Sequence, residues 1–331
     1  MMDFKIYGNE GSKTLISNMI RRSREPHSII IHGDKGLGKK KLALWTAAAL
    51  LCEEGGGEPC GRCKNCRLIA EGTHPDVVTA KSGEKGNYMV DDIRPIVSDA
   101  VILPTEGRMK VYIIPDLDRS VVTAVQIQNI LLKLIEEPPD HTAVILTAAS
   151  REVFLETILS RVISLAALPV TDAQSAEYLE LYENTDPASA GEAVKAGRGN
   201  IGRCIDYLAG GLFKNGADCA RALARAALGR REYDILMALS QTDSSRALFH
   251  ECAVLFSEIV RDSMRIRLEG RTAVTVGCDE EAARRMSTLF SEEKTLALYD
   301  LVCSYVRASD ASCNLTLAIN SFAAELGEYF T

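Results

Sequence analysis

The sequence predicts two kinds of structure in one chain, an α/β domain built on a parallel sheet and an all-helical remainder. The first observation is the segment 28–44, SIIIHGDKGLGKKKLAL, where a short apolar strand leads through a glycine-rich turn into a helix. The second is that further short apolar runs alternate with helical patterns up to about residue 165, as in a parallel sheet flanked by helices. The third is that only helical periodicity follows Pro169.

The composition is that of an ordinary globular protein. The 331 residues are 47% hydrophobic and 25% charged, and this length suits two or three domains. A formal net charge of −7 argues against independent, non-specific DNA binding, which needs a basic face. The first residues, MMDFKIYGNEG, hold neither a basic nor an apolar segment, and no apolar run has the length of a membrane span. We therefore expect a cytoplasmic protein without membrane contact.

The glycine-rich turn has the spacing G-x-x-x-x-G-K of a phosphate-binding loop, whose backbone N–H groups surround an anion at a helix N-terminus. The residues of the motif are Gly33, Gly36, Gly38 and Lys39. The next position normally carries Ser or Thr, whose hydroxyl holds magnesium, but here it is Lys40. A tight structural turn that never meets a nucleotide is the alternative interpretation. The sequence predicts the fold of a phosphate loop and leaves ATP binding doubtful.

Four of the ten cysteines are clustered, at Cys52, Cys60, Cys63 and Cys66. Four thiolates on one short Gly- and Pro-rich loop suit a closed tetrahedral zinc site, which is structural because no coordination position stays open. An iron–sulfur cluster is the competing interpretation, but the ferredoxin run has its fourth cysteine downstream and followed by proline, which is absent here. A third interpretation is that the four cysteines are simply buried thiols without a metal. We expect the other six cysteines to be small buried residues, and His74 to be a loop residue.

The strand predicted at 110–114, KVYII, is apolar on both faces, as a central parallel strand should be. A nucleotide hydrolase follows this strand with Asp-Glu. Here Pro115 takes the place of the aspartate that holds magnesium, and Asp116 the place of the residue that activates water. Side chains alternate between the two faces of a strand, so Asp116 points to the opposite face from position 115 and cannot replace the aspartate missing there. Losing one such group costs on the order of 10²–10³ in rate, so we expect no intrinsic ATP hydrolysis.

Other elements follow from periodicity and from helix-stop signals. In the first part we predict helices at about 13–23, 42–51, from Asp91 and at 128–137, and strands at 28–31, 77–78, 110–114 and 143–147. Beyond Pro169 we predict helices at 171–182, 188–196, 220–228, 245–268, 280–289, 292–308 and 315–329, and a turn at 197–203 that leads into a helix ending at Leu208. Ser160 and Arg161 follow the segment 155–159. An arginine near a helix end is, by itself, most often solvated or paired with an acid.

The order of these features resembles the AAA+ subunits of bacterial clamp loaders. The residues that carry the resemblance are Gly8-Asn9, the phosphate loop, the four-cysteine insertion, His74-Pro75-Asp76, QNILLKLIEEPP and Ser160-Arg161. The similarity is dense over about residues 5–165 and weak beyond them. Motor members of the family carry GKT or GKS and an intact Asp-Glu. Lys40 and Pro115 differ from this motor pattern, and the resemblance therefore favours a non-hydrolysing member of the family.

The resemblance implies an AAA+ P-loop domain at 1–168 with a zinc module at 52–66, a helical lid at 169–210 and a helical collar domain at 211–331. It also implies that Arg161, within the Ser160-Arg161 motif, acts as an arginine finger in the ATP site of a neighbouring subunit. The partners would be gamma or tau and delta subunits, the sliding clamp (beta) and primed DNA. The third lid helix of the family usually presents a sensor arginine, whose place falls on Gly202, one residue before Arg203.

Two other functions stay open at this point. The chain is alternatively an active motor of the gamma or tau type, using Lys40 with Asp116 or Asp118 in a non-standard metal site. A stand-alone zinc-bearing DNA-binding protein is the third possibility, disfavoured by the acidic net charge and the lack of a base-reading module.

Overall fold

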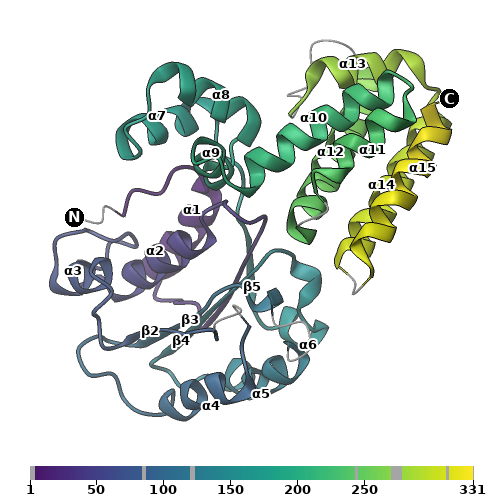
Figure 1. Cartoon of the computed structure of the whole chain (residues 1–331). Coiled ribbons are helices and arrows are strands. Elements are labelled where there is room, and N and C mark those ends of the chain that lie inside the picture. Colours follow the sequence, from purple (N-terminus) through teal and green to yellow (C-terminus); the bar gives the residue numbers. More distant parts are fainter. Residues whose placement is uncertain are drawn as a thin grey trace. The chain divides into compact units, whose positions relative to one another are not determined.

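The computed structural model describes residues 4–83, 87–119, 124–242, 245–269, 278–310 and 313–330. The chain divides into two compact units, Met1–Val170 and Thr171–Thr331, which are described separately. Within the described ranges, every strand belongs to the first unit, and the second unit is helical (Figure 1). The predicted combination of an α/β part and an all-α part is therefore confirmed. The further division of the second unit into a lid at 169–210 and a collar at 211–331 stays a prediction.

The first unit is built on a five-stranded parallel sheet with the strand order β2-β3-β4-β1-β5. The strands are β1 (Ser28–His32), β2 (Val77–Thr79), β3 (Lys110–Ile114), β4 (Thr142–Ala148) and β5 (Ile163–Ala166). β1 lies between β4 and β5, and Ile29 is in register with Ile145 on one side and Ile163 on the other. Since the strands are parallel, the carboxyl ends of β1, β3 and β4 meet at one edge of the sheet.

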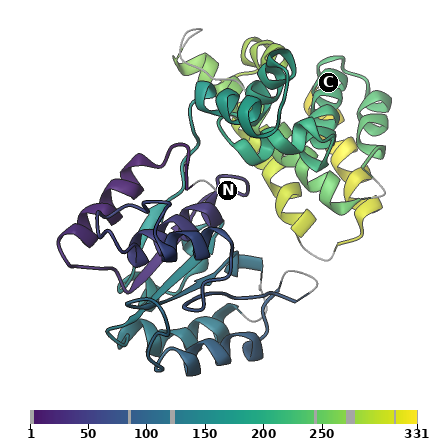
Figure 2. The ribbon, with the colours of Figure 1, turned by 90° about the vertical axis from the view of Figure 1, so that its left-hand side faces the viewer.

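Helices cover both faces of this sheet (Figures 1 and 2). The helices of the unit are α1 (Glu10–Arg21), α2 (Lys39–Leu51), α3 (Lys64–Ala70), α4 (Val90–Asp99), α5 (Ala124–Glu136) and α6 (Glu156–Leu159), with short 3₁₀ turns η1 (Leu117–Arg119) and η2 (Arg151–Val153). Ile29 and Ile31 pack into a core with α1 and α2. Ile30, on the other face, packs with α4 and α5. This double burial explains why the central strands are almost wholly apolar.

The second unit consists of helices only in its described residues. They are α7 (Asp172–Tyr182), α8 (Pro187–Gly197), α9 (Ile201–Leu208), α10 (Leu212–Leu228), α11 (Glu232–Ser240), α12 (Arg246–Glu269), α13 (Glu280–Leu289), α14 (Glu292–Asp310) and α15 (Leu315–Phe330). Helices α7–α9 share a small core around Leu179, Val194 and Cys204. Helices α10–α15 share a larger one, in which the rings of Phe249 and Phe322 pack edge to face, 6.2 Å apart.

Local sequence signals explain where the first helices of this unit begin. The Thr171 hydroxyl accepts a hydrogen bond from the Gln174 N–H, and the Gln174 side chain accepts one from the Thr171 N–H, which forms a capping box at α7. The Asp186 carboxylate caps α8, and Pro187 occupies its first position, where no N–H is needed.

Most predicted elements agree with the structure, and several differ. The sequence analysis does not predict strand β5, which has only four residues and is interrupted by Ser164. It does not predict helices α6 and α11, and it does not predict helix α3 because the cysteine pattern dominates that sequence. Helix α10 begins eight residues before its predicted start because Gly216 weakens the helical signal. A Cβ at Gly216 would lie 2.6 Å from Glu251 Cγ, so this glycine permits close packing of α10 on α12. In the part of the chain that the structure describes, no helix has the length and apolar character to span a bilayer.

Candidate functional site

The predicted phosphate loop connects β1 to α2 at the carboxyl edge of the sheet. Gly33 has φ 145°, and a Cβ there would lie 2.7 Å from the carbonyl oxygen of Ala167. The Gly33 N–H donates to the carbonyls of Ala148 and Ala149 at 3.2 and 3.1 Å. Gly38, with φ 77°, is the N-cap of α2. Close approach at Gly33 and left-handed backbone at Gly38 are conditions that glycine meets without strain.

The two lysines after the last glycine differ in their surroundings. Lys39 is buried, with 7% of its surface exposed, and its ammonium donates to the carbonyls of Gly33 and Asp34 at 2.8 and 3.1 Å. Lys40 is exposed. The first turn of α2 contains no acidic residue, so the positive end of the helix dipole and its lysines make this region electropositive. The loop keeps the electrostatics of an anion site, although position 40 offers no hydroxyl to a metal.

The end of β3 supplies Pro115 and Asp116, as the sequence predicts. Asp116 has left-handed backbone, φ 48°, and its N–H donates to the Thr147 hydroxyl at 2.9 Å. The backbone after β3 is thus fixed to β4, and the following turn η1 contains Asp118. A buried oxygen of the Asp118 carboxylate has no hydrogen-bond partner among the described residues. The residue directly after β3 is Pro115, so no carboxylate lies at this position.

Three small residues, Ala148, Ala149 and Ser150, end β4 and lead to the turn η2. Ala148 and Ala149 contribute carbonyls to Gly33, as described above, and their side chains are methyl groups. The Ser150 hydroxyl accepts a hydrogen bond from the Glu152 N–H and caps the turn η2. These three residues stabilise the loop and the turn.

Ser160 and Arg161 follow α6 and are exposed. One terminal nitrogen of the Arg161 guanidinium donates to the Thr157 carbonyl and to the Ser160 hydroxyl, both at 2.9 Å. The other lies 3.2 Å from Oε1 of Glu136, at the end of α5. The arginine side chain therefore lies at the surface with its terminal nitrogens held by its own chain.

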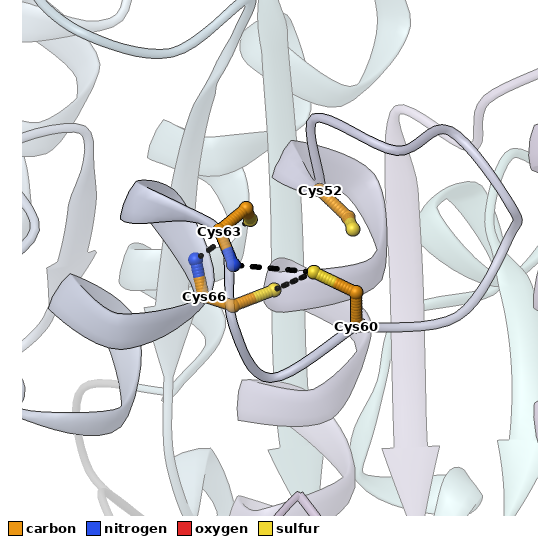
Figure 3. Close-up of side chains that lie close together, drawn as sticks. All are labelled: Cys52, Cys60, Cys63 and Cys66. Atoms are coloured by element: carbon orange, nitrogen blue, oxygen red, sulfur yellow. Dashed lines mark hydrogen bonds between the residues drawn. The ribbon is translucent and has the colours of Figure 1, made fainter.

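The four clustered cysteines converge as the sequence predicts (Figure 3). Their sulfur atoms all lie within 4.8 Å of one another, and those of Cys60 and Cys66 are 4.0 Å apart. Four sulfurs bound tetrahedrally to zinc at about 2.3 Å would be about 3.8 Å apart, so the arrangement is compatible with a Zn²⁺ ion.

The cysteines do not all lie on a loop, which corrects one detail of the prediction. Cys52 ends α2, and Cys63 is the N-cap of α3, where its sulfur accepts a hydrogen bond from the Cys66 N–H at 3.4 Å. Helix ends thus place three of the four sulfurs, because Cys66 lies in the first turn of α3.

The thiols differ in acidity because their surroundings differ. Burial raises the pKa of Cys66. Burial also acts on Cys60, but the N–H groups of Arg62 and Cys63 outweigh it and lower the pKa of Cys60 to about 7. Metal binding requires thiolates, so a bound ion would displace the remaining protons.

His74 and Asp76 anchor the cysteine module to the sheet. From the sequence, only a turn is predicted at these residues. His74 is buried, and its Nδ1 accepts the Asp76 N–H at 3.1 Å, so its Nε2–H donates to the side-chain oxygen of Asn65 at 3.2 Å. Asn65, in α3, donates in turn to the Leu51 carbonyl at 2.9 Å. Burial lowers the pKa of His74, consistent with the neutral form that this chain of bonds requires.

In the second unit, the arginines around the predicted sensor position point into the helical bundle. Arg198, at the end of α8, pairs with Asp262 and lies 3.6 Å from Glu258. Arg203 lies 3.4 Å from Glu258 and stacks over the ring of Phe213 at 5.3 Å. Asp262 is fully buried, so its charge requires this pairing. Both arginines are occupied within the unit.

Comparison with known proteins identifies relatives of the first unit. Residues 8–170 match the family model described as DNA polymerase III, delta subunit. The chain is 34% identical to DNA polymerase III subunit delta' of Pseudomonas aeruginosa over 187 residues, which are 56% of each chain. It is 33% identical to subunit delta' of Bacillus subtilis over 156 residues, covering 47% of this chain and 46% of that one. Against subunit tau of Escherichia coli it is 32% identical over 157 residues, 47% of this chain and 24% of that one.

The matched region therefore spans about half the length of the delta' relatives and about a quarter of tau. Among solved structures, the chain is similar to a DNA polymerase III gamma subunit-related protein of Thermotoga maritima, with 20% identity and a TM-score of 0.44, over 96% of this chain and 99% of that one.

Proposed function

We propose that this chain, whose residues 8–170 belong to the DNA polymerase III clamp-loader family, is the non-hydrolysing delta-prime subunit of such a loader. In this role it helps to open the sliding clamp and to load it on primed DNA during replication. The observation that carries the proposal is the pair of losses at the nucleotide site, Lys40 in the loop and Pro115 after β3.

The two losses remove both protein anchors for magnesium. A hydrolysing site of this kind holds the metal through a hydroxyl at the loop and an aspartate at the carboxyl end of another strand of the same sheet, here β3. The chain offers an ammonium at the first position and a proline at the second. Groups of this kind are each worth on the order of 10²–10³ in rate, so the isolated chain should not turn over ATP. Phosphate binding at Lys39 and the loop N–H groups is a separate property.

Arg161 is the residue through which the chain would contribute to catalysis. Its guanidinium is exposed at the surface, beside Ser160, where a second subunit can approach it. An arginine supplied in trans to a nucleotide site is worth about 10³–10⁵ in rate, because it stabilises charge on the transferring phosphoryl group. We assign this finger role to Arg161.

The four cysteines would hold structural zinc. Zinc bound by Cys52, Cys60, Cys63 and Cys66 would tie the end of α2 to the start of α3, and it leaves no open position for catalysis. The metal would supply stability to this part of the first unit.

The assembly follows from the proposed role. Partners are gamma or tau and delta subunits, the beta clamp and primed DNA within the complex, in the cytoplasm. We assign α7–α9 to a lid and α10–α15 to a collar through which the subunits associate. Arg198 and Arg203 pair with α12, which favours a lid that does not sense nucleotide.

A second candidate is an active motor subunit of the gamma or tau type. The comparable identity to tau, 32% against 34% for delta', favours retaining it. This candidate requires a metal site assembled from Lys40 with Asp116 or Asp118, whereas hydroxyl and carboxylate oxygens are the usual ligands of magnesium.

The test is DNA-stimulated ATP hydrolysis by the purified chain, by a loader reconstituted with it, and by the same loader carrying Arg161→Ala. We expect a silent isolated chain and a large loss of loader turnover in the variant. ATP turnover that co-purifies with the isolated chain would instead identify a motor. An unchanged rate in the variant loader would reject the finger.

A further inference from the structure

The side chain of Arg161 has an acidic neighbour whose position in the chain is unusual. Glu136 is the last residue of α5, and Glu137 follows it. Acids at a helix C-terminus face the negative end of the helix dipole, so neither residue stabilises α5 electrostatically. Oε1 of Glu136 lies 3.2 Å from a terminal nitrogen of Arg161, and α5 packs against α6, which precedes the arginine. The pairing with Arg161 gives a physical reason for an acid at this position.

We infer that Glu136 is a latch that holds Arg161 against its own chain until the neighbouring subunit presents a triphosphate. This inference rests on the proposed finger role of Arg161. A guanidinium binds a carboxylate and a phosphoryl group with the same fork of N–H donors, so the two anions compete for it. Glu136 would act through Arg161 as a positioning residue and would not touch the nucleotide.

The exposure of the pair sets the strength of the latch. The side chains of Arg161 and Glu136 are 43% and 39% exposed, so water and salt weaken their attraction. Exposed pairs of this kind typically shift an equilibrium by no more than about fivefold. A triphosphate with its several negative charges can therefore displace the carboxylate. The ion pair therefore favours the conformation in which Arg161 contacts Glu136, but it does not prevent Arg161 from leaving Glu136 to bind a nucleotide.

The hydrogen bonds of the other terminal nitrogen support the same arrangement. That nitrogen donates to the Thr157 carbonyl and to the Ser160 hydroxyl, both within the turn that carries Arg161. These two bonds and the ion pair direct the guanidinium toward α5 and α6. Glu136 is the only one of these three partners that carries a charge, so its removal changes the electrostatic hold while leaving the local turn intact.

The test compares ATP hydrolysis by loaders reconstituted with the full chain as wild type, Glu136→Gln, Glu137→Gln or Arg161→Ala. Glu137→Gln is the matched control, because it removes the same charge one residue away from the pair. We expect Glu136→Gln to raise kcat at the site that Arg161 serves by up to about fivefold. The KM for ATP should stay unchanged, and the gain over wild type should shrink as salt is added.

The outcomes separate this inference from the proposed function. If Arg161→Ala lowers turnover and Glu136→Gln behaves like Glu137→Gln or lowers kcat, the latch is rejected while the finger stands. If Arg161→Ala leaves turnover unchanged, the finger role fails and the latch fails with it. A higher kcat for Glu136→Gln alone, diminishing with salt, supports the latch.

Discussion

Replacing Asp76 with Asn should destabilise the first unit by about 2–4 kcal/mol at neutral pH. The Asp76 side chain is fully buried. Its two oxygens accept the N–H groups of Thr105, Glu106 and Gly107, each at 2.7 Å. Asn has nearly the same shape but only one acceptor oxygen, so its NH₂ group must face at least one of these donors. The variant also loses the charge that strengthens the remaining bonds.

The pH dependence of this effect provides an independent check. Burial alone would raise the pKa of Asp76, but the three N–H groups outweigh it and hold the pKa below its usual value. A carboxyl whose pKa is lowered by folding stabilises the protein fully above its unfolded pKa, about 3.9, and less as the pH falls through the folded value. The difference between wild type and Asp76→Asn should therefore be constant from about pH 8 to 5 and should shrink below about pH 4.

Urea unfolding followed by Trp45 fluorescence measures this difference. Trp45 is the single tryptophan of the chain and is buried in the first unit, so it reports on that unit. Asp91→Asn serves as the control, because Asp91 is exposed and forms an ion pair with Arg94 on the helix surface. We expect this substitution to change the stability by less than about 0.5 kcal/mol. The reasoning is refuted if Asp76→Asn is as stable as this control at pH 7, or if the difference grows as the pH falls toward 4.

Two further predictions concern the metal and the nucleotide loop. Protein purified without chelator should contain one zinc ion per chain by metal analysis. The substitution Cys60→Ser should lower the zinc content and alter the fluorescence of Trp45, because Trp45 and Cys60 line the same cavity of about 550 Å³. The control substitution Cys303→Ser should leave the zinc content and the fluorescence unchanged. Trace zinc in native, unreduced protein would contradict the assignment. Lys40→Thr alone should leave the isolated chain without ATP turnover, because Pro115 still occupies the second anchor position. If this one substitution produced ATP turnover, Pro115 would not be what prevents hydrolysis.

The sequence predicted what depends on periodicity or on local spacing. The apolar runs at β1, β3 and β4 and the four cysteines are signals of this kind, and the structure confirms the strands and the convergence of the sulfurs. Interactions between distant segments left no local pattern. Asp76 binds the N–H groups of residues 105–107, about 30 positions further on, and a sequence shows only a turn there.

The partners of charged residues are the second kind of information that the sequence did not contain. Arg161 stands out because it follows Ser160, but its pairing with Glu136 depends on how α6 packs on α5. In the same way, spacing alone places Arg203 one residue beyond a sensor position. Its contacts with Glu258 and Phe213 depend on the packing of α9 against α12 and α10. A charge is easy to find in a sequence, but its partner is determined by tertiary structure.

The glycine-rich loop at 33–39 has structural roles that do not depend on nucleotide chemistry. A Cβ at position 33 would lie 2.7 Å from the Ala167 carbonyl, and the Gly33 N–H donates to the carbonyls that end β4. Lys39 donates to two carbonyls of its own loop. These contacts join the ends of β1, β4 and β5 to the start of α2 in the structure without a bound anion. Lys40, in contrast, is exposed, and the residue after β3 is Pro115. The phosphate loop and the tight structural turn are therefore compatible interpretations of the same residues, and the proposed distinction between a motor and a non-hydrolysing subunit depends on positions 40 and 115.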